Sequence, residues 1–176
     1  MRKLFTLISV FLSASMAYAQ GGIPLLDKAA GERVSFHYTY SLSQKGADFF
    51  SVTDGDVVVE GNCYILEGLG LEVRSDGETR WTTDRDAKEL LIENVEGEDL
   101  FTNPALFLSS YKNYMDKIVV NSEGENSLDV TLILDDETKA RFVLSNVDFE
   151  DAMQGKSGFT MDVKSLPQDF VITDLR

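Results

Sequence analysis

The stretch VSFHYTYSLS, residues 34–43, decides how the chain folds. Every second residue in it is apolar, and the residues between are polar or small; the apolar set is Val34, Phe36, Tyr38, Tyr40 and Leu42. An apolar residue at every second position turns one side of a strand toward a core and the other toward water. The stretch therefore predicts a half-buried β-strand whose inner face is strongly aromatic.

Similar patterns recur along most of the chain and predict further strands, at 57–60, 63–67, 69–73, 80–83, 89–95, 128–134, 140–147, 159–164 and 170–175. Turn residues separate them, at 45–47, 53–55, 61–62, 84–86 and 135–136, and Asp76-Gly77 is a strong hairpin signal. Only two short helices are expected, at 25–30 after Pro24 and from Thr102-Asn103-Pro104 to about Tyr111. Many short strands joined by turns predict a mainly β protein, an antiparallel meander closed or partly closed into a barrel.

The N-terminus has the features of a cleavable secretory signal. Arg2 and Lys3 precede a short apolar run at 4–12, and Ala17-Tyr18-Ala19 fits the small-x-small cleavage pattern. A membrane span needs about 20 apolar residues, and this run is much shorter. We expect residues 1–19 to be removed, which leaves 20–176 as a single domain. No cysteine follows the cleavage point, so we expect a soluble mature protein without a lipid anchor.

The composition argues against several classes of partner and site. The chain has 30 acidic and 16 basic residues and a net charge of −14, and such a surface repels nucleic acid and anionic membranes. Cys63 is the single cysteine, so no disulfide can form within the chain. His37 is the single histidine and lies on the polar side of its strand, where a solvated or hydrogen-bonded imidazole is expected.

No pattern of residues predicts catalysis. One histidine and one cysteine do not make a usual zinc site, and the carboxylate pairs fall in predicted turns. Asp54-Gly55-Asp56 lacks the register of a calcium loop. We therefore expect a binding protein rather than an enzyme, with no cofactor and no metal.

The apolar residues of the predicted inner strand faces are the candidates for a binding surface. They could all point into one concave volume: Phe36, Tyr38, Tyr40, Val57, Val59, Leu69, Leu71, Val73, Trp81, Leu90 and Ile92. The alternative is an ordinary core, because periodicity does not distinguish a filled barrel from one that holds a ligand.

The sequence resembles the LolA family of periplasmic lipoprotein carriers over almost all of the mature chain. The resemblance lies in the strand-and-hairpin block at 55–60 and 71–84, which includes Ser75-Asp76-Gly77-Glu78-Thr79-Arg80-Trp81, in the helix start at 102–108, and in the ending at 159–167 and 171–176. It implies an incomplete β-barrel with a helical lid, to which Leu106, Phe107 and Leu108 would belong.

The resemblance also implies a function. A member of this family would carry the acyl chains of lipoproteins through the periplasm of a Gram-negative bacterium, as a monomer, from an inner-membrane release complex to an outer-membrane acceptor. The alternative within the same fold is a periplasmic sensor of lipids or lipoproteins. One departure is that Gly61-Asn62 stands where family members often have an Arg-Pro whose arginine holds the lid shut. Arg74 and Arg80 are the arginines that could substitute for it.

Overall fold

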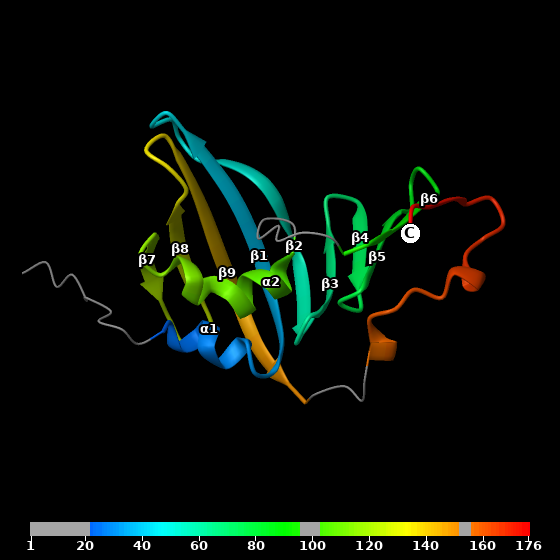
Figure 1. Cartoon of the computed structure of the whole chain (residues 1–176), viewed down its shortest axis with the longest axis horizontal. Helices are drawn as coiled ribbons and strands as arrows, with labels where there is room; N and C mark the ends of the chain where they lie inside the picture. The colour runs from blue at the N-terminus through cyan, green and yellow to red at the C-terminus, as the bar shows by residue number, and fades with distance from the viewer. Residues whose placement is uncertain (1–21, 96–102, 152–155) are drawn as a thin grey trace, which may run out of the picture.

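The computed structural model describes residues 22–95, 103–151 and 156–176, which form one ten-stranded sheet with a few short helices (Figure 1). The signal segment at 1–19 lies outside the described residues. The strands are β1 (Arg33–Gln44), β2 (Phe50–Glu60), β3 (Cys63–Gly68), β4 (Leu71–Ser75), β5 (Thr79–Asp84), β6 (Glu89–Asn94), β7 (Ile118–Glu123), β8 (Leu128–Ile133), β9 (Thr138–Glu150) and β10 (Val171–Asp174). The helices are α1 (Pro24–Ala29) and α2 (Pro104–Ser110), with short 3-10 helices η1 (Tyr111–Tyr114), η2 (Lys156–Gly158) and η3 (Val163–Ser165).

The sheet is open, with the strand order β10-β6-β5-β4-β3-β2-β1-β9-β8-β7. β10 and β7 are its two edges, so the prediction of a mainly β protein is confirmed and full closure is excluded. Neighbouring strands are antiparallel except for β10, which runs parallel to β6. Val171 at the start of β10 pairs with Glu89 at the start of β6.

The sheet curves around a core that α1 and α2 cover from the concave side (Figure 1). Both predicted helices are present, and each has a proline at its first turn. The two helices lie over the part of the sheet formed by β1, β2, β8 and β9, and no helix lies over β4, β5 or β6 in Figure 1. No described helix is both long and apolar enough to cross a membrane.

The sheet buries opposite faces in its two halves. Opposed residues of antiparallel strands share a face, and Phe36 is in register with Val57, which is in register with Leu66. This row of side chains points into the concave core. Trp81 pairs with Arg74, which belongs to the neighbouring row, so Trp81 points to the convex face.

On the convex face, a second apolar cluster lies beneath the chain that leads to β10. It consists of Trp81, Leu90 and Ile92, with Met161, Val163, Leu166 and Phe170 packed against them. Residues 159–170 therefore act as a strap over β5 and β6. The strap is also held at Phe159, whose ring lies 5.5 Å from the guanidinium carbon of Arg33.

Two local predictions were wrong, and one strand was missed. The turn predicted at 53–55 lies inside β2, where Gly55 packs against the backbone of Gly68. The strand predicted at 159–164 is an irregular segment of the strap, in which Met161 and Val163 pack against the Trp81 cluster without pairing with a strand. The strand β7, by contrast, was not predicted.

Candidate functional site

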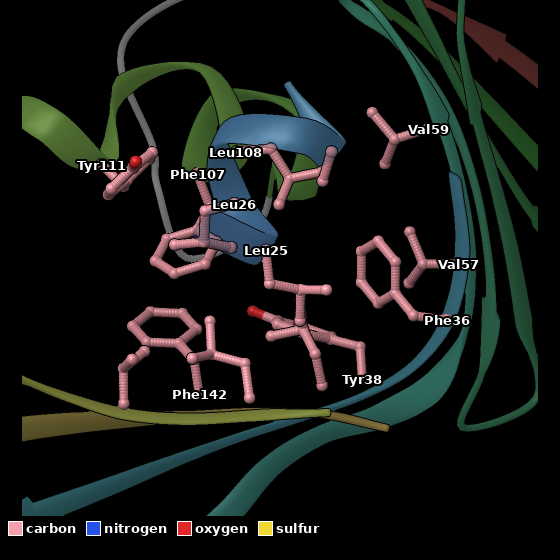
Figure 2. Close-up of a cluster of buried hydrophobic side chains, with 14 of the residues drawn as sticks. Leu25, Leu26, Phe36, Tyr38, Val57, Val59, Phe107, Leu108, Tyr111 and Phe142 are labelled. Carbon is pink, nitrogen blue, oxygen red and sulfur yellow. The ribbon is translucent and has the colours of Figure 1, made fainter. Parts of the chain in front are cut away.

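The largest apolar assembly of the protein lies on the concave face beneath the two helices (Figure 2). Its centre is the ring of Phe142 on β9, which stacks on Tyr40 at 5.2 Å and on Phe107 of α2 at 4.5 Å between ring centroids. Tyr38 lies 6.2 Å away and in turn contacts Phe36. The aromatic inner face predicted for β1 is therefore buried against α2 and β9.

The two helices depend on this core for their stability. A helix as short as the six residues of α1 is not stable alone in water. It buries Leu25, Leu26 and Ala29, and the Nζ atom of Lys28 lies 3.6 Å from the ring centroid of Phe149. In α2 the Asn103 side chain accepts a hydrogen bond from the Leu106 amide at 3.0 Å, which caps the helix.

A buried tyrosine links α1 to the end of α2. The Tyr111 hydroxyl donates to Asp27 Oδ1 at 2.7 Å and accepts from the Ile23 amide at 3.0 Å. Lys112 reaches the same carboxylate at 2.6 Å. A Cβ on Gly22 would lie 2.4 Å from both the Tyr111 hydroxyl and the Asp27 carboxylate, so the link closes around a residue without a side chain.

The electrostatics of this link favour the ionised carboxylate. Hydrogen bonds from Lys112 and then from Tyr111 lower the pKa of Asp27 below its ordinary value. Burial, followed by the hydrogen bond to Asp27, raises the pKa of Tyr111. The hydroxyl therefore stays protonated and remains a donor to α1.

Apolar side chains continue along the concave face beyond the helices. Leu66 on β3 and Val73 on β4 are half-buried and pack against the helix-covered cluster. Val73 is in register with Thr82, and Thr82 with Leu91 on β6, which is also half-buried. The helix-covered cluster therefore extends into a less covered strip that leads toward the β10 edge.

Most of the predicted cavity and lid residues gather in the helix-covered cluster. Those inside it are Phe36, Tyr38, Tyr40, Val57, Val59, Phe107 and Leu108, and those half-buried at its margin are Val73 and Leu106. None of the buried set is more than 4 % exposed.

Five other predicted cavity residues lie elsewhere. Trp81, Leu90 and Ile92 belong to the convex cluster, because the register turns them to the opposite face. Leu69 is 70 % exposed in the turn between β3 and β4, with φ at 52°, and Leu71 is 36 % exposed at the end of β4. These five residues do not share one volume with Phe36.

Sequence reasoning also missed several residues of the concave face. The most prominent are Leu25, Leu26, Tyr64, Leu66, Leu91, Tyr111 and Phe142. The sequence did contain a pattern that predicts burial of Phe142, because the apolar residues Ala140, Phe142 and Leu144 alternate with other residues in a predicted strand. Tyr111 had none, because its partners Ile23 and Asp27 are more than 80 residues away in the chain.

The arginines considered as substitutes for the family's lid arginine bind other groups. Arg80 pairs with Glu93 at 2.8 Å on the less covered strip. Arg74 is on the convex face, where it donates to Glu72 and to the Gly158 carbonyl oxygen. Their hydrogen-bonded partners in the described structure do not belong to α1 or α2.

The single histidine and the single cysteine both lie on the convex face. Within 22–95, 103–151 and 156–176, no group of three or more potential metal ligands is close enough to hold an ion. His37 lies between Asp56 and Asp54, at 3.0 and 3.4 Å. Burial raises the pKa of the Cys63 thiol, which makes it a poor nucleophile.

The surface of the sheet also has a small hollow beside β4. It has a volume of about 230 Å³ and is lined by Glu67, Gly70, Leu71, Glu72 and Arg85. Glu72 is buried there, and although burial opposes ionisation, hydrogen bonds from Arg74 and Arg85 lower its pKa overall. The two arginines therefore satisfy the hydrogen-bonding needs of a buried carboxylate. The concave apolar face remains the candidate binding site.

Comparison with known proteins gives no family model that matches the chain and no curated protein that matches it.

Proposed function

We propose that this protein is a periplasmic carrier that binds the acyl chains of lipoproteins on its concave face and transfers them from the inner to the outer membrane. The observation that carries this proposal is the helix-covered cluster itself. A broad apolar face of an open sheet is covered by helices of six and seven residues, and the described part of the chain places no second sheet over it. The resemblance of the sequence to LolA carriers supports the same proposal.

Acyl chains need such a shield in water. Exposure of an acyl chain costs about 0.8 kcal/mol for each CH₂ group, so the chains of one lipidated cysteine cost on the order of tens of kcal/mol. A protein that replaces its own apolar contacts with contacts to the chains offsets most of this cost. Transfer then needs only an acceptor that binds the chains better.

The cover must move for a ligand to enter, because the residues beneath it are already closely packed. Leu26, Leu108 and Phe142 are no more than 1 % exposed. Displacement of α1 and α2 leaves the ladders of the sheet intact, since neither helix is part of them. The less covered strip with Leu66, Val73 and Leu91 supplies further apolar surface for the chains.

The test is direct binding of a synthetic diacylglyceryl peptide, with mass spectrometry of the purified protein for bound lipid. Leu66 and Ile65 offer a matched pair, because they are adjacent, half-buried and on opposite faces. We expect Leu66→Glu to weaken binding at least tenfold and Ile65→Glu to leave it unchanged.

Two outcomes would refute the proposal. One is the absence of lipid binding combined with normal lipoprotein sorting in cells depleted of the protein. The other is equal loss of binding in both variants with the fold intact, which would mean that the concave face is not the site. Lipid binding without any effect of depletion on sorting would favour a sensor over a carrier.

A further inference from the structure

We propose that the outer edge of β10 docks an extended peptide, namely the segment of the cargo that directly follows its acylated residue. This inference rests on the proposed function, because the acyl chains bring the peptide to the edge. The peptide would pair with β10 and extend the sheet by one strand.

The backbone of β10 has unused pairing capacity along its outer side. The amides of Val171 and Leu175 donate to the carbonyl oxygens of Lys88 and Ile92, both at 2.8 Å. Backbone groups of alternate residues point to opposite sides of a strand. The amide and carbonyl groups of Ile172 and Asp174 therefore point away from β6, where the described sheet has no further strand.

The side chains of this edge are apolar and exposed. Val171, Ile172 and Leu175 are 61, 46 and 65 % exposed. Sheet edges are usually protected by a lysine, a proline or a bulge. β10 contains none of these; it is short, and its one charged residue is Asp174 at its end, which pairs with Arg176 at 2.8 Å.

The other edge of the sheet is better protected. β7 has a register shift between Val120 and Ser122, and Asn121 at that point donates to Asp129 and Thr131 of β8. The amide of Leu25 in α1 also donates to Glu123 of β7. The two edges therefore differ, and β10 is the one open to pairing.

The concave face explains why a cargo peptide would reach β10. The row of side chains that starts at Val57 passes through Leu66, Val73 and Thr82 to Leu91, and Leu91 is in register with Thr173 of β10. The helices cover the other half of the sheet (Figure 1). In this proposal the acyl chains lie along this row with their free ends toward the helices, which places the attached peptide beside the β10 edge.

The covalent link to the acyl chains makes a weak pairing effective. Four residues of β10 form few hydrogen bonds, which is too little for a free peptide to bind tightly. A peptide tethered beside its site has an effective concentration in the millimolar range. Because the protein carries a net charge of −14, the favoured peptide is neutral or basic.

The test compares two fluorescent ligands, a diacylglyceryl cysteine amide and the same lipid followed by a six-residue neutral linker. We expect the linker to slow dissociation from the wild-type protein about tenfold. Ile172→Pro removes an outward amide and keeps both hydrogen bonds from Val171 and Leu175 to β6. It should abolish the effect of the linker and leave binding of the amide unchanged, whereas the control Thr173→Val should behave as wild type.

Three results would overturn the inference. The linker could have no effect on the wild-type protein, Ile172→Pro could weaken both ligands equally, or Ile172→Pro could abolish a self-association seen in light scattering. The last result would assign the edge to a second copy of the chain.

If neither lipid binds, the proposed function fails, and the edge is tested with the linker peptide alone at millimolar concentration. NMR shifts of the Ile172 and Asp174 amides would then support the edge site, and unchanged amides would refute it.

Discussion

At the scale of single residues, Tyr111 shows how a buried polar atom positions a helix. Its hydroxyl is one atom, yet it satisfies the Ile23 amide and the Asp27 carboxylate of α1 at the same time. Ile23 is fully buried, so water does not replace the partner of its amide if the hydroxyl is removed, whereas Asp27 is exposed and keeps its ion pair with Lys112.

Tyr111→Phe should therefore lower the free energy of unfolding by about 1–3 kcal/mol, the cost of leaving the buried Ile23 amide without a partner. Urea denaturation measures this loss. Tyr114→Phe is the matched control, because Tyr114 is in the same 3-10 helix and is only half-buried. An equal loss in the two variants would show that the hydroxyl contacts of Tyr111 are unimportant.

His37 should make stability depend on pH. The hydrogen bond to Asp56, with the charges of Asp54 and Asp56, raises the pKa of His37, although burial opposes the shift. A raised pKa in the folded state means that the protonated form is bound more tightly than in the unfolded chain. Its contribution is complete below the unfolded pKa of about 6.5 and is lost as pH rises through the folded value.

The comparison of wild type with His37→Gln checks this expectation. The difference in unfolding free energy should be largest near pH 5.5 to 6 and should disappear at alkaline pH. A difference that grows with pH would contradict the raised pKa. NMR titration of the imidazole gives the folded pKa directly.

At the scale of elements, α2 is held to the sheet by apolar contact. The stack of Phe107 on Phe142 is its closest aromatic contact with β9. Phe107→Ala should lower the free energy of unfolding by about 3–5 kcal/mol, because it removes a buried ring and leaves a cavity. Ser109→Ala in the same helix is exposed and should change stability by less than about 0.5 kcal/mol.

The strap over β5 and β6 is an independent element with its own anchor. Trp81→Ala should detach residues 161–170 from the convex face, because Met161, Val163, Leu166 and Phe170 pack on the cluster that it belongs to. Limited proteolysis should then cleave the strap much faster than in wild type. Lipid binding on the concave face should persist, and its loss would show that the two faces are coupled.

At the scale of the whole molecule, the sequence predicted the strands better than their faces. Alternation at 34–43 identifies β1 and its inner side because that strand is central and one of its faces is in the core. In β5 and β6 the alternation is equally clear, but it does not say which face of the sheet is buried. Only the register shows that Trp81 lies in line with Ser35 through Val58, Ile65 and Arg74.

Close contacts between the backbones of neighbouring strands were also not predicted from the sequence. Asp54-Gly55 looks like a turn, but a Cβ on Gly55 would lie 2.4 Å from the Glu67 carbonyl oxygen of β3. The glycine is needed there for the approach of two strands, not for a change of direction. Residues of the candidate site that belong to a local alternating pattern were predicted. Residues whose partners are distant in the chain, such as Tyr111, were not.

The reversal of the buried face between β4 and β5 has a mechanical consequence. One half of the sheet is clamped from the concave side by helices, and the other from the convex side by the strap. Val73 belongs to the margin of the first cluster and Trp81 to the second, so the boundary between these clusters falls between β4 and β5. A bend of the sheet along that line would leave the packing within each cluster unchanged, so we expect the β5–β6–β10 half to move relative to the rest of the sheet as one unit.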